Sequence, residues 1–507
     1  MRKIFNILLL ISVSVFFIVG CSSPGGDDNG GNNNNNNGQD NPVPTLNSIS
    51  PTSKVNHMPS FTLTVNGTNF ITSSKIVFNG TEKNTTYVSA AELTCTVDPD
   101  EITLASTARY DESNIHDILS TNVPVKVRSP APGGGDSGTK NFKITDKHTF
   151  NGPDKLADIE VLYTSTHKGI CAKSPGYVYA IWYDYTSGSK GTYFSYSTDQ
   201  GVTWSTPERM FNSPDFYGSK IDTDSSGNIC VLGYNDTGPG DGIHFTRSTD
   251  HGNTWSSPKT IAQSSDNYGD RELFVDSADN INTIYLKDSY LFFSRSTDNG
   301  ANWSTPVQIY SKNNIRTPKF TVADNGNIYV VWKRQTLGID LIYFIRSTND
   351  GSSWGGLTEM ERNWKFASHP DIAVNKAGDI YVVYSDSRTI RQYINLVKST
   401  DKGATWSAMK QISTKEMYYS LDLAVDNAGN AFAAWQSTQN TNSDWNIYYT
   451  DSFDDGVTWP SSRNISETSG GSFTNPVISL DSEGNIYILC IGNFSGNWEI
   501  DLIYSQR

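Results

Sequence analysis

The sequence predicts an all-β protein with at least two domains, and three observations support this prediction. Aromatic residues make up 12% of the chain, and glycine and asparagine, which favour turns, are frequent. A nine-residue motif recurs six times at nearly constant spacing after residue 196. The length of 507 residues exceeds that of one compact domain of usual size.

The first twenty residues have the features of a secretory signal, because Arg2 and Lys3 precede an apolar run over residues 4–19. The stretch Ile18-Val19-Gly20-Cys21 resembles the lipobox of bacterial lipoproteins. This resemblance implies a signal peptide at 1–20 and an acylated Cys21, with the lipid bilayer as a partner. It places the protein in the cell envelope, with the outer membrane or cell surface favoured. A cleaved signal with an incidental cysteine is the alternative. Residues 21–43 are rich in glycine and asparagine and are predicted to form a disordered tether.

Charge and metal-ligand spacing exclude several classes of function. The net charge of −14 repels phosphates, so we expect no nucleic-acid partner. The histidines are dispersed and no Cys/His cluster occurs, so we expect neither a metal site nor a cofactor. Four cysteines follow Cys21 at wide spacing and are predicted to be buried free thiols, namely Cys95, Cys171, Cys230 and Cys490.

Residues 44–145 show alternating apolar segments separated by Gly/Asn turns, which predicts a small β-sandwich. The segments "PTLNSISPTS", "LTVNGTNF", "SKIVFNG" and "VPVKVRSPAPGGGDSGTKNFKI" resemble successive strands of an IPT/TIG immunoglobulin-like domain. The resemblance implies that the glycine-rich stretch is the loop of the closing hairpin rather than a linker. Such a domain is expected to act as a spacer.

Residues 146–507 contain a repeat of about fifty residues. The tryptophans of its six motif copies, such as "STDQGVTWS" and "STDNGANWS", are separated by 51, 48, 51, 52 and 53 residues. Each unit contains four short alternating segments, which predicts a four-stranded meander. Meanders repeated about an axis form a β-propeller.

The motif resembles the Asp box, S-x-D-x-G-x-T-W, of the BNR-repeat and sialidase superfamily. Its aspartate and serine can bond the backbone of their own turn, its glycine permits positive φ and its tryptophan covers the sheet edge, so we expect a structural role. The residues expected in this role are Asp199, Trp204, Asp250, Trp255, Asp298, Trp303, Trp354, Asp401, Trp406, Asp454 and Trp459.

The number of blades follows from the strand count. The second-strand signature, as in "GNIYVVW", occurs seven times, and the units supply 26 strands, whereas six blades hold only 24. Seven blades are therefore favoured, with the missing outer strand of the last supplied by residues 147–158. Six blades, as in sialidases, are the alternative.

Function is expected where the repeats differ, in loops around the central opening on the face away from the Asp boxes. Aromatic and charged side chains there suit a sugar. The ligand-binding candidates are Tyr217, Tyr268, Arg271, Arg316, His369 and Tyr419, with Asp184, Arg334, Arg388 and Trp445 further out. The catalytic candidates are Asp270, Glu272, Asp371, Glu416 and Tyr418.

The superfamily resemblance implies an arginine triad, a tyrosine nucleophile paired with a glutamate, and an acidic residue. The first arginine of that triad has no counterpart, since no arginine lies between Ser129 and Glu208 and no R-I-P motif occurs. We therefore expect an envelope lipoprotein that binds a glycan or a surface protein without a complete sialidase site. A sialidase-like, exo-acting glycoside hydrolase and a structural envelope protein are the alternatives.

Overall fold

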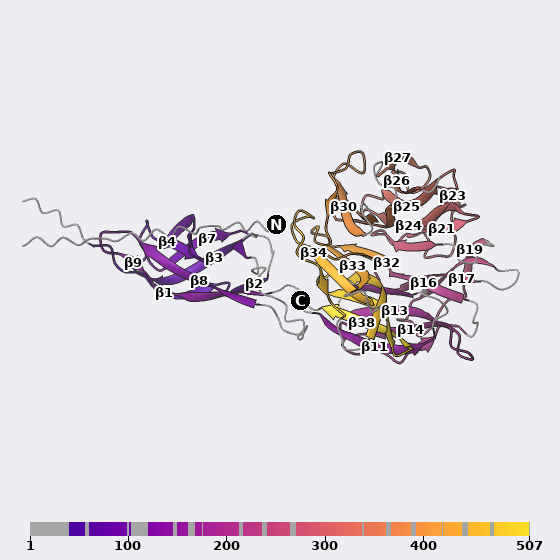
Figure 1. Ribbon diagram of the computed structural model, residues 1–507, viewed down its shortest axis with the longest axis horizontal. Coiled ribbons are helices and arrows are strands. Elements are labelled where there is room, and N and C mark those ends of the chain that lie inside the picture. The colour runs from indigo at the N-terminus through magenta and orange to yellow at the C-terminus, as the bar shows by residue number, and fades with distance from the viewer. Residues whose placement is uncertain are drawn as a thin grey trace, which may run out of the picture.

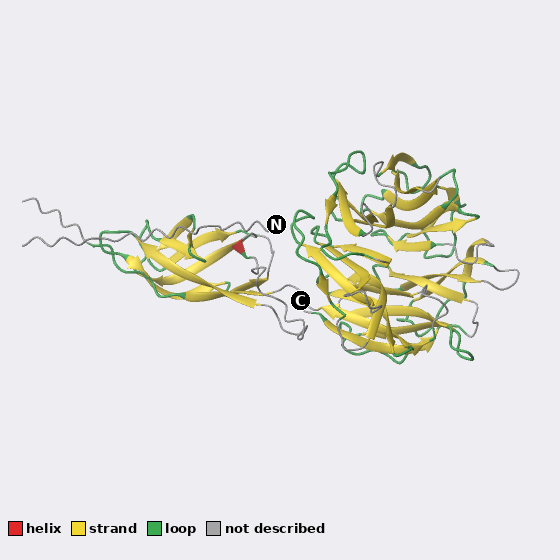
Figure 2. Ribbon diagram, in the orientation of Figure 1, coloured by secondary structure: helices red, strands yellow, loops and turns green. Residues whose placement is uncertain are grey.

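The computed structural model describes residues 40–55, 60–98, 101–102, 120–145, 150–160, 168–174, 176–211, 216–235, 241–263, 270–336, 339–360, 367–386, 392–417, 419–438, 445–466 and 471–505. Apart from a single 3₁₀ turn at Glu101, the regular elements in these residues are β-strands (Figure 2). The prediction of an all-β protein is confirmed. The predicted signal peptide and Cys21 lie outside the described residues.

The first domain is a two-sheet sandwich built around one core. Its strands are β1 (Thr45–Ser50), β2 (Ser53–Val55), β3 (Phe61–Thr68), β4 (Lys75–Phe78), β5 (Thr81–Glu82), β6 (Thr85–Ser89), β7 (Glu92–Val97), β8 (Ser120–Ser129), β9 (Gly135–Asp136) and β10 (Lys140–Thr145). One sheet has the order β1-β3-β7-β6, and the other has the order β2-β10-β8-β4-β5 with β9 beside β8. Alternate residues of both sheets, such as Leu63, Val65, Val125 and Val127, fill the core.

The C-terminal hairpin of this domain agrees with the prediction, and its N-terminal boundary differs from it. Strand β10 pairs antiparallel with β8, so the glycine-rich stretch between them is a hairpin loop, as predicted. The backbone N–H of Asn41 donates to Pro132 O at 2.7 Å, and its side chain donates to Pro130 O at 2.8 Å. The folded domain therefore includes Asn41, whereas the prediction extended the tether to residue 43.

The described residues from Asn151 to Ser505 form seven four-stranded sheets, called blades 1 to 7 below. Blades 1 to 4 are, in order, β12 (Lys168–Ser174), β13 (Tyr177–Asp184), β14 (Gly191–Ser197), β15 (Glu208–Arg209); β16 (Phe216–Thr223), β17 (Ile229–Asn235), β18 (Gly242–Ser248), β19 (Lys259–Gln263); β20 (Arg271–Val275), β21 (Ile281–Lys287), β22 (Tyr290–Ser296), β23 (Val307–Gln308); and β24 (Ile315–Val322), β25 (Ile328–Thr336), β26 (Ile339–Ser347), β27 (Gly355–Glu359). Blades 5 to 7 are β28 (Ala367–Val374), β29 (Ile380–Asp386), β30 (Tyr393–Ser399), β31 (Lys410–Gln411); β32 (Tyr419–Val425), β33 (Ala431–Thr438), β34 (Trp445–Ser452), β35 (Arg463–Asn464); and β36 (Gly471–Leu480), β37 (Ile486–Phe494), β38 (Asn497–Ser505), β11 (Asn151–Ile159).

These sheets form a closed ring. The first strand of each blade contacts the first strand of the next, and β36 of blade 7 contacts β12 of blade 1. Blade 7 combines both ends of the propeller chain, because β11 pairs antiparallel with β38, with Asp154 opposite Leu502 (Figure 1). The sequence places this closing strand at residues 147–158, and the pairing confirms the closure. It leaves neither end strand as an open edge.

The core lies between neighbouring blades. The second strands are buried on both faces, which explains their nearly continuous apolar runs. Trp182, Trp332 and Trp435 occupy the same position in three of these strands and are fully buried. The four cysteines in the described residues are free and buried, as predicted.

Each Asp-box loop bonds to itself. In blade 1, Asp199 Oδ1 accepts bonds from the Ser197 hydroxyl and the Thr203 N–H, both at 2.8 Å, and Asp199 Oδ2 accepts one from the Thr203 hydroxyl at 2.6 Å. The Gly201 N–H donates to Ser197 Oγ at 2.8 Å. These bonds, those from Thr203 above all, lower the pKa of Asp199. Its carboxylate is therefore occupied by the loop.

The glycine of each loop meets the preceding blade. A β-carbon on Gly300 would lie 2.1 Å from an edge carbon of Phe245, and Gly300 has φ of +84°. The same conflict would arise at Gly252 with Phe194, at Gly351 with Phe293 and at Gly403 with Phe344. The box tryptophan then packs edge-to-face on that ring, with 5.4 Å between the centroids of Phe245 and Trp303. The motif thus docks one blade on the next.

The interface between blades 6 and 7 uses a substitute for the missing box. Tyr449 occupies the position of Phe245, three residues before the end of its strand. Phe150, which directly precedes the outer strand β11, packs edge-to-face on Tyr449 with 4.8 Å between centroids. A phenylalanine from the start of the propeller therefore takes the place of a box tryptophan and completes the ring of contacts.

The contact between Gly300 and Phe245 predicts the effect of a methyl group on stability. We expect Gly300→Ala to lower the free energy of unfolding by about 1–2 kcal/mol from the backbone conformation and by a further ~1–3 kcal/mol from the clash. The control is Gly378→Ala, because Gly378 has φ of +89° but nothing within 4 Å of its β-carbon position. Denaturant titration of both variants measures the difference, and equal losses would contradict the docking role. Phe245→Ala combined with Gly300→Ala should be less destabilising than the sum of the single changes.

Candidate functional site

The innermost strands line the centre of the ring, and five of them are bulged near their start. The pairing register shifts within β16, β24, β28, β32 and β36. In the last four of these strands, the bulge holds a non-glycine residue in the left-handed region, namely Thr317, His369, Ser420 and Asn475. A bulge changes the direction of the side chains that follow it.

Charged residues occupy one register position in five successive blades. Each lies opposite the same position of the second strand, where an aliphatic residue such as Leu232 or Val331 stands. These residues are Lys220, Glu272, Lys319, Asp371 and Asp422. Together with Lys168 of blade 1, whose Nζ donates to Asn475 O, they are called the central charged cluster.

Lys319 lies at the middle of this cluster. Its Nζ is 3.1 Å from Asp422 Oδ1, 3.8 Å from Glu272 Oε1 and 3.9 Å from Asp371 Oδ1. Lys220 Nζ is 2.8 Å from Glu272 Oε1. The cluster thus contains three lysines and three carboxyl groups.

The carboxylates also join neighbouring blades. Asp371 of β28 accepts the N–H of Leu423 in β32 at 2.7 Å, and Asp422 of β32 accepts the N–H of Ile478 in β36 at 2.8 Å. Asp222 of β16 makes the same bond to Val275 in β20. These three bonds hold the innermost strands together.

Burial shifts the pKa values of several residues in the cluster in different directions. It raises the pKa of Asp371 to about 8, although Lys319 opposes this shift. Burial also opposes ionisation of Asp422, but Lys319 and the Ile478 N–H outweigh it, so the pKa of Asp422 lies below its ordinary value. Burial lowers the pKa of Lys168 to about 8. The two aspartates therefore differ in protonation near neutral pH.

An aromatic patch, formed by Tyr183, Tyr185, Tyr217 and Lys190, lies at the blade 1 and blade 2 side of the opening. The rings of Tyr183 and Tyr217 are stacked with 4.3 Å between centroids. Lys190 Nζ lies 3.2 Å from the Tyr217 hydroxyl and 5.9 Å from the ring centroid of Tyr185. Buried Arg271 donates to Tyr217 O at 3.2 Å, and burial lowers the pKa of this arginine to about 10. The predicted Tyr217 and Arg271 are thus brought together.

The other predicted residues fall into separate environments. Asp270 is largely enclosed, its Oδ2 accepts the Thr317 N–H at 2.8 Å, and burial raises its pKa. Tyr419 is exposed and packs edge-to-face on Trp445 at 5.6 Å. Arg316 is exposed, and Glu416 is partly exposed. The predicted residues Tyr268, Arg388 and Tyr418 lie outside the described residues.

Two of the outlying candidates have local roles. Asp184 is buried and accepts bonds from the Glu160 N–H and from both the N–H and hydroxyl of Thr186. The Asp184 carboxylate is therefore bonded to the backbone and hydroxyl groups around it. Arg334 Nε donates to Asn313 O at 3.1 Å.

Sequence reasoning identified Glu272 and Asp371 but missed Lys168, Lys220, Lys319 and Asp422. The residues of the cluster share a position in the innermost strands, not a residue type. Aligning the innermost strands on the seven second-strand signatures places a charged residue at one position in blades 2 to 6. Because these positions hold lysine, glutamate or aspartate, a search for identical residues does not find the pattern.

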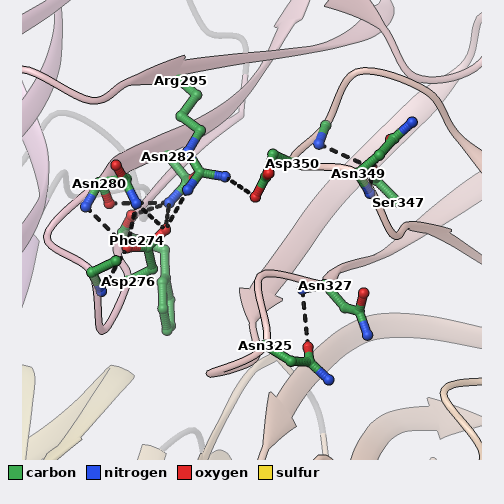
Figure 3. Close-up of polar contacts among 12 residues, drawn as sticks. Phe274, Asp276, Asn280, Asn282, Arg295, Asn325, Asn327, Ser347, Asn349 and Asp350 are labelled. Carbon is green, nitrogen blue, oxygen red and sulfur yellow. Dashed lines mark hydrogen bonds and ion pairs between the residues drawn. The ribbon is translucent and has the colours of Figure 1, made fainter.

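The opposite face carries the Asp boxes and the arginines that precede them. Arg295 donates to Asp350 Oδ1 at 2.6 Å in the next blade and to Asp276 Oδ2 at 3.2 Å in its own (Figure 3). Asp276 also receives bonds from Asn280 and Asn282 in its turn (Figure 3). A cavity of about 350 Å³ between blades 3 and 4 is lined by Phe293, Arg295, Trp303 and Asp350, among others. Its charged groups are thus paired with one another.

Two searches of the described residues concern metals and membranes. No group of three or more His, Cys, Asp or Glu residues in that part of the chain is placed to hold a metal ion. No helix there is long and apolar enough to span a bilayer.

The raised pKa of Asp371 predicts a pH dependence of stability. Asp371 keeps its proton in the folded state up to about pH 8 but loses it near pH 4 when unfolded. Unfolding therefore releases a proton between these pH values, and the free energy of unfolding falls as the pH rises, by up to about 1.4 kcal/mol per pH unit. We expect Asp371→Asn to make this fall less steep, as measured by denaturant titration at pH 5 and pH 8. The control Asp324→Asn changes an exposed carboxylate and should leave the slope intact. A wild-type slope equal to that of Asp371→Asn would refute the assignment.

Comparison with known proteins agrees with this architecture. An ulvan lyase of polysaccharide lyase family PL25, bound to -[GlcA(1-4)Rha3S]-, is similar with a TM-score of 0.51 at 13% identity, over 68% of this chain and 94% of the lyase. An α-L-arabinanase of Penicillium chrysogenum has a TM-score of 0.40 at 14% identity, over 57% and 92% of the two chains. The NanB sialidase of Streptococcus pneumoniae has a TM-score of 0.40 at 12% identity, over 88% and 83%. No curated protein sequence matches the chain.

Family models match both domains. The model of the IPT/TIG domain matches residues 44–143. The model of the BNR repeat-like domain matches residues 175–382 and again residues 242–488. Together the two BNR matches cover more than half of the chain, and they include five complete blades. The chain therefore belongs to the BNR repeat-like domain family and carries an IPT/TIG domain before its propeller.

Proposed function

We propose that this protein binds a glycan at the central opening of its propeller and does not hydrolyse it. The aromatic patch beside the central charged cluster is the observation that carries this proposal. Partly exposed Tyr185 and Tyr217 offer apolar ring surface, Tyr217 stacks on the buried ring of Tyr183, and Lys190 places charge at the edge of the patch. The C–H faces of a sugar ring pack on aromatic rings, while its hydroxyls bond to charged and amide groups.

The chemistry of the opening favours a saccharide over a protein partner. A protein interface of ordinary size has an apolar centre that excludes water. Here the centre of the ring holds six ionisable side chains, and aromatic rings gather in the patch on blades 1 and 2 and in the pair of Tyr419 and Trp445 on blade 6. The ulvan lyase adds support of a general kind, because a protein of similar fold is bound to a saccharide.

Glycoside hydrolysis is the second candidate, and the central charged cluster favours it. Asp371 has a raised pKa and Asp422 a lowered one, a pattern that suits an acid and an ionised carboxylate. Both, however, accept backbone N–H bonds from the next blade and both lie close to Lys319. Groups held in this way join strands, so we place binding before hydrolysis.

We also propose that the protein is a lipoprotein of the cell envelope, favouring the outer membrane or cell surface. The lipobox-like stretch before Cys21 supports an acyl anchor. About twenty residues rich in glycine and asparagine then separate Cys21 from Asn41, at the edge of the first sheet sandwich. Such a segment reaches several nanometres when extended, which keeps the opening accessible to large glycans.

The glycan proposal predicts the effect of removing one ring. We expect wild-type protein to bind at least one member of a panel of neutral and uronate-containing oligosaccharides, measured by calorimetry. Tyr217→Ala should weaken that binding by about tenfold, because the stacked surface is lost. The control Tyr177→Ala removes a ring that stacks on His251 on the Asp-box face, and it should bind as the wild type does. New reducing ends in the same mixtures would instead favour hydrolysis, and absence of binding by the wild type would contradict the proposal.

The anchor proposal predicts a change in fractionation. In a bacterial host we expect the wild-type protein in the membrane fraction and Cys21→Ser in the soluble fraction, because the serine cannot carry the thioether-linked acyl group. Labelling with a fatty-acid analogue should mark the wild type alone. Cys95→Ser serves as the control, since this thiol is buried in the first domain. Membrane association of Cys21→Ser equal to that of wild type would rule out the anchor.

A further inference from the structure

Two residues at the opening hold strained backbone at equivalent places in neighbouring blades. Thr317 of β24 has φ of 45°, and His369 of β28 has φ of 50°. Each lies in the bulge of its strand, one residue before a proline. A β-branched or bulky residue in the left-handed region is unfavourable by about 1–3 kcal/mol, and such strain clusters at binding sites.

The same two residues carry enclosed polar atoms without partners. Among the described residues, Thr317 Oγ1 and His369 Nδ1 have no hydrogen-bond partner. Buried polar side-chain atoms in folded proteins are nearly always bonded, so each exception needs an explanation. Strain and an unsatisfied polar atom therefore coincide at both positions.

The bulge of blade 7 shows that the geometry itself does not require this. Asn475 occupies the equivalent place with φ of 52°. Its N–H donates to Gln436 Oε1 at 3.3 Å, and its carbonyl accepts the Lys168 ammonium. The backbone of this bulge is thus bonded to both neighbouring blades, as the Thr317 N–H is to Asp270, but Thr317 and His369 each carry in addition a side-chain atom without a partner.

Neighbouring groups hold these two residues in place. The Thr317 N–H donates to Asp270 Oδ2 at 2.8 Å across the interface of blades 3 and 4. Lys333 of blade 4 donates to the hydroxyl of Ser368, next to His369, at 3.3 Å. Burial and the charge of Lys333 lower the pKa of His369 to about 4. The ring is therefore neutral at pH 7 and has one donor and one acceptor nitrogen.

We propose that Thr317 Oγ1 and His369 Nδ1 form a subsite for neighbouring hydroxyl groups of the bound saccharide. Both side chains are partly exposed, and χ1 of the threonine and χ2 of the histidine are rotatable, so these atoms are not fixed in their present directions. Both are neutral groups that can accept and donate hydrogen bonds, so they suit sugar hydroxyls rather than a carboxylate or sulfate. Asp270 acts as a positioning residue, because it fixes the Thr317 backbone. The subsite rests on the proposed glycan function.

Isosteric variants and nitrogen NMR test the subsite. Thr317→Val removes the hydroxyl and keeps the shape, and His369→Phe removes the ring nitrogens. We expect each to weaken binding of the best oligosaccharide from the panel by about five- to tenfold, while His369→Asn, which retains a polar atom near the Nδ1 position, restores most of it. The ¹⁵N signal of the His369 imidazole should shift on addition of that oligosaccharide. The thermal midpoint of Thr317→Val should be unchanged or higher, because an unsatisfied polar atom is removed, whereas a structural hydroxyl would lower it.

His251 supplies the matched control. It too has a left-handed backbone, with φ of 57°, but its Nδ1 is 2.8 Å from the Tyr179 hydroxyl on the Asp-box face. His251→Asn should leave the affinity unchanged. If an oligosaccharide binds while the His369 signal stays fixed and Thr317→Val binds normally, the subsite is wrong and the glycan function stands. If no oligosaccharide of the panel binds the wild type, the function and the subsite fall together.

Discussion

The contact between an Asp-box glycine and an aromatic ring of the preceding blade is the constraint on which the propeller depends. Blades are pleated sheets that pack face to face, and their relative rotation is set by the few places where backbones approach closely. At Gly300 the approach to Phe245 leaves no room for a β-carbon, and the same holds at Gly252, Gly351 and Gly403. The serine and aspartate of each box bond to their own loop, so the glycine is presented in a fixed conformation. The motif is therefore a loop of fixed conformation that packs against the sheet of the preceding blade.

The centre of the ring is held by polar rather than apolar contacts. Seven strands that converge on one axis leave a narrow space, which large apolar side chains cannot fill without clashes. Carboxylates at this position can bond the backbone of the next strand, as Asp371 does to Leu423, and lysines can neutralise them. The mixture of charges makes the arrangement possible, because Asp371 and Asp422 each have both a backbone N–H and the Lys319 ammonium nearby. The central charged cluster therefore forms a polar layer at the centre of the ring.

Features of this fold that recur with the repeat could be predicted from the sequence, whereas features that depend on the pairing register of the strands could not. Glycine and tryptophan recur with the repeat, so the blades and even the closing strand beside β38 could be predicted. The partner of Gly300 could not, because Phe245 lies in another unit and no local pattern links the two. Lys319 and Asp422 were not predicted for a related reason: they share a register position in the innermost strands of their blades but not a residue type. Asp184 shows the converse: a carboxylate suits a binding site, but this one accepts hydrogen bonds from the N–H and hydroxyl of Thr186 in the adjoining loop.

The two faces of the propeller differ in how their polar side chains are bonded. On the Asp-box face, polar groups are used repeatedly, as in the pairing of Arg295 with Asp276 and Asp350. On the opposite face, the bulges place Thr317 and His369 in strained conformations with unused polar atoms. Strain of a few kcal/mol persists only where the surrounding structure fixes it. The docked boxes and the closed ring supply that rigidity, so the loops around the opening are free to differ from blade to blade. Buried polar atoms without a partner among the described residues occur on both faces, as at Arg295 Nε and Trp303 Nε1 beside the Asp boxes. At Thr317 and His369, such an atom and a left-handed backbone occur in the same residue.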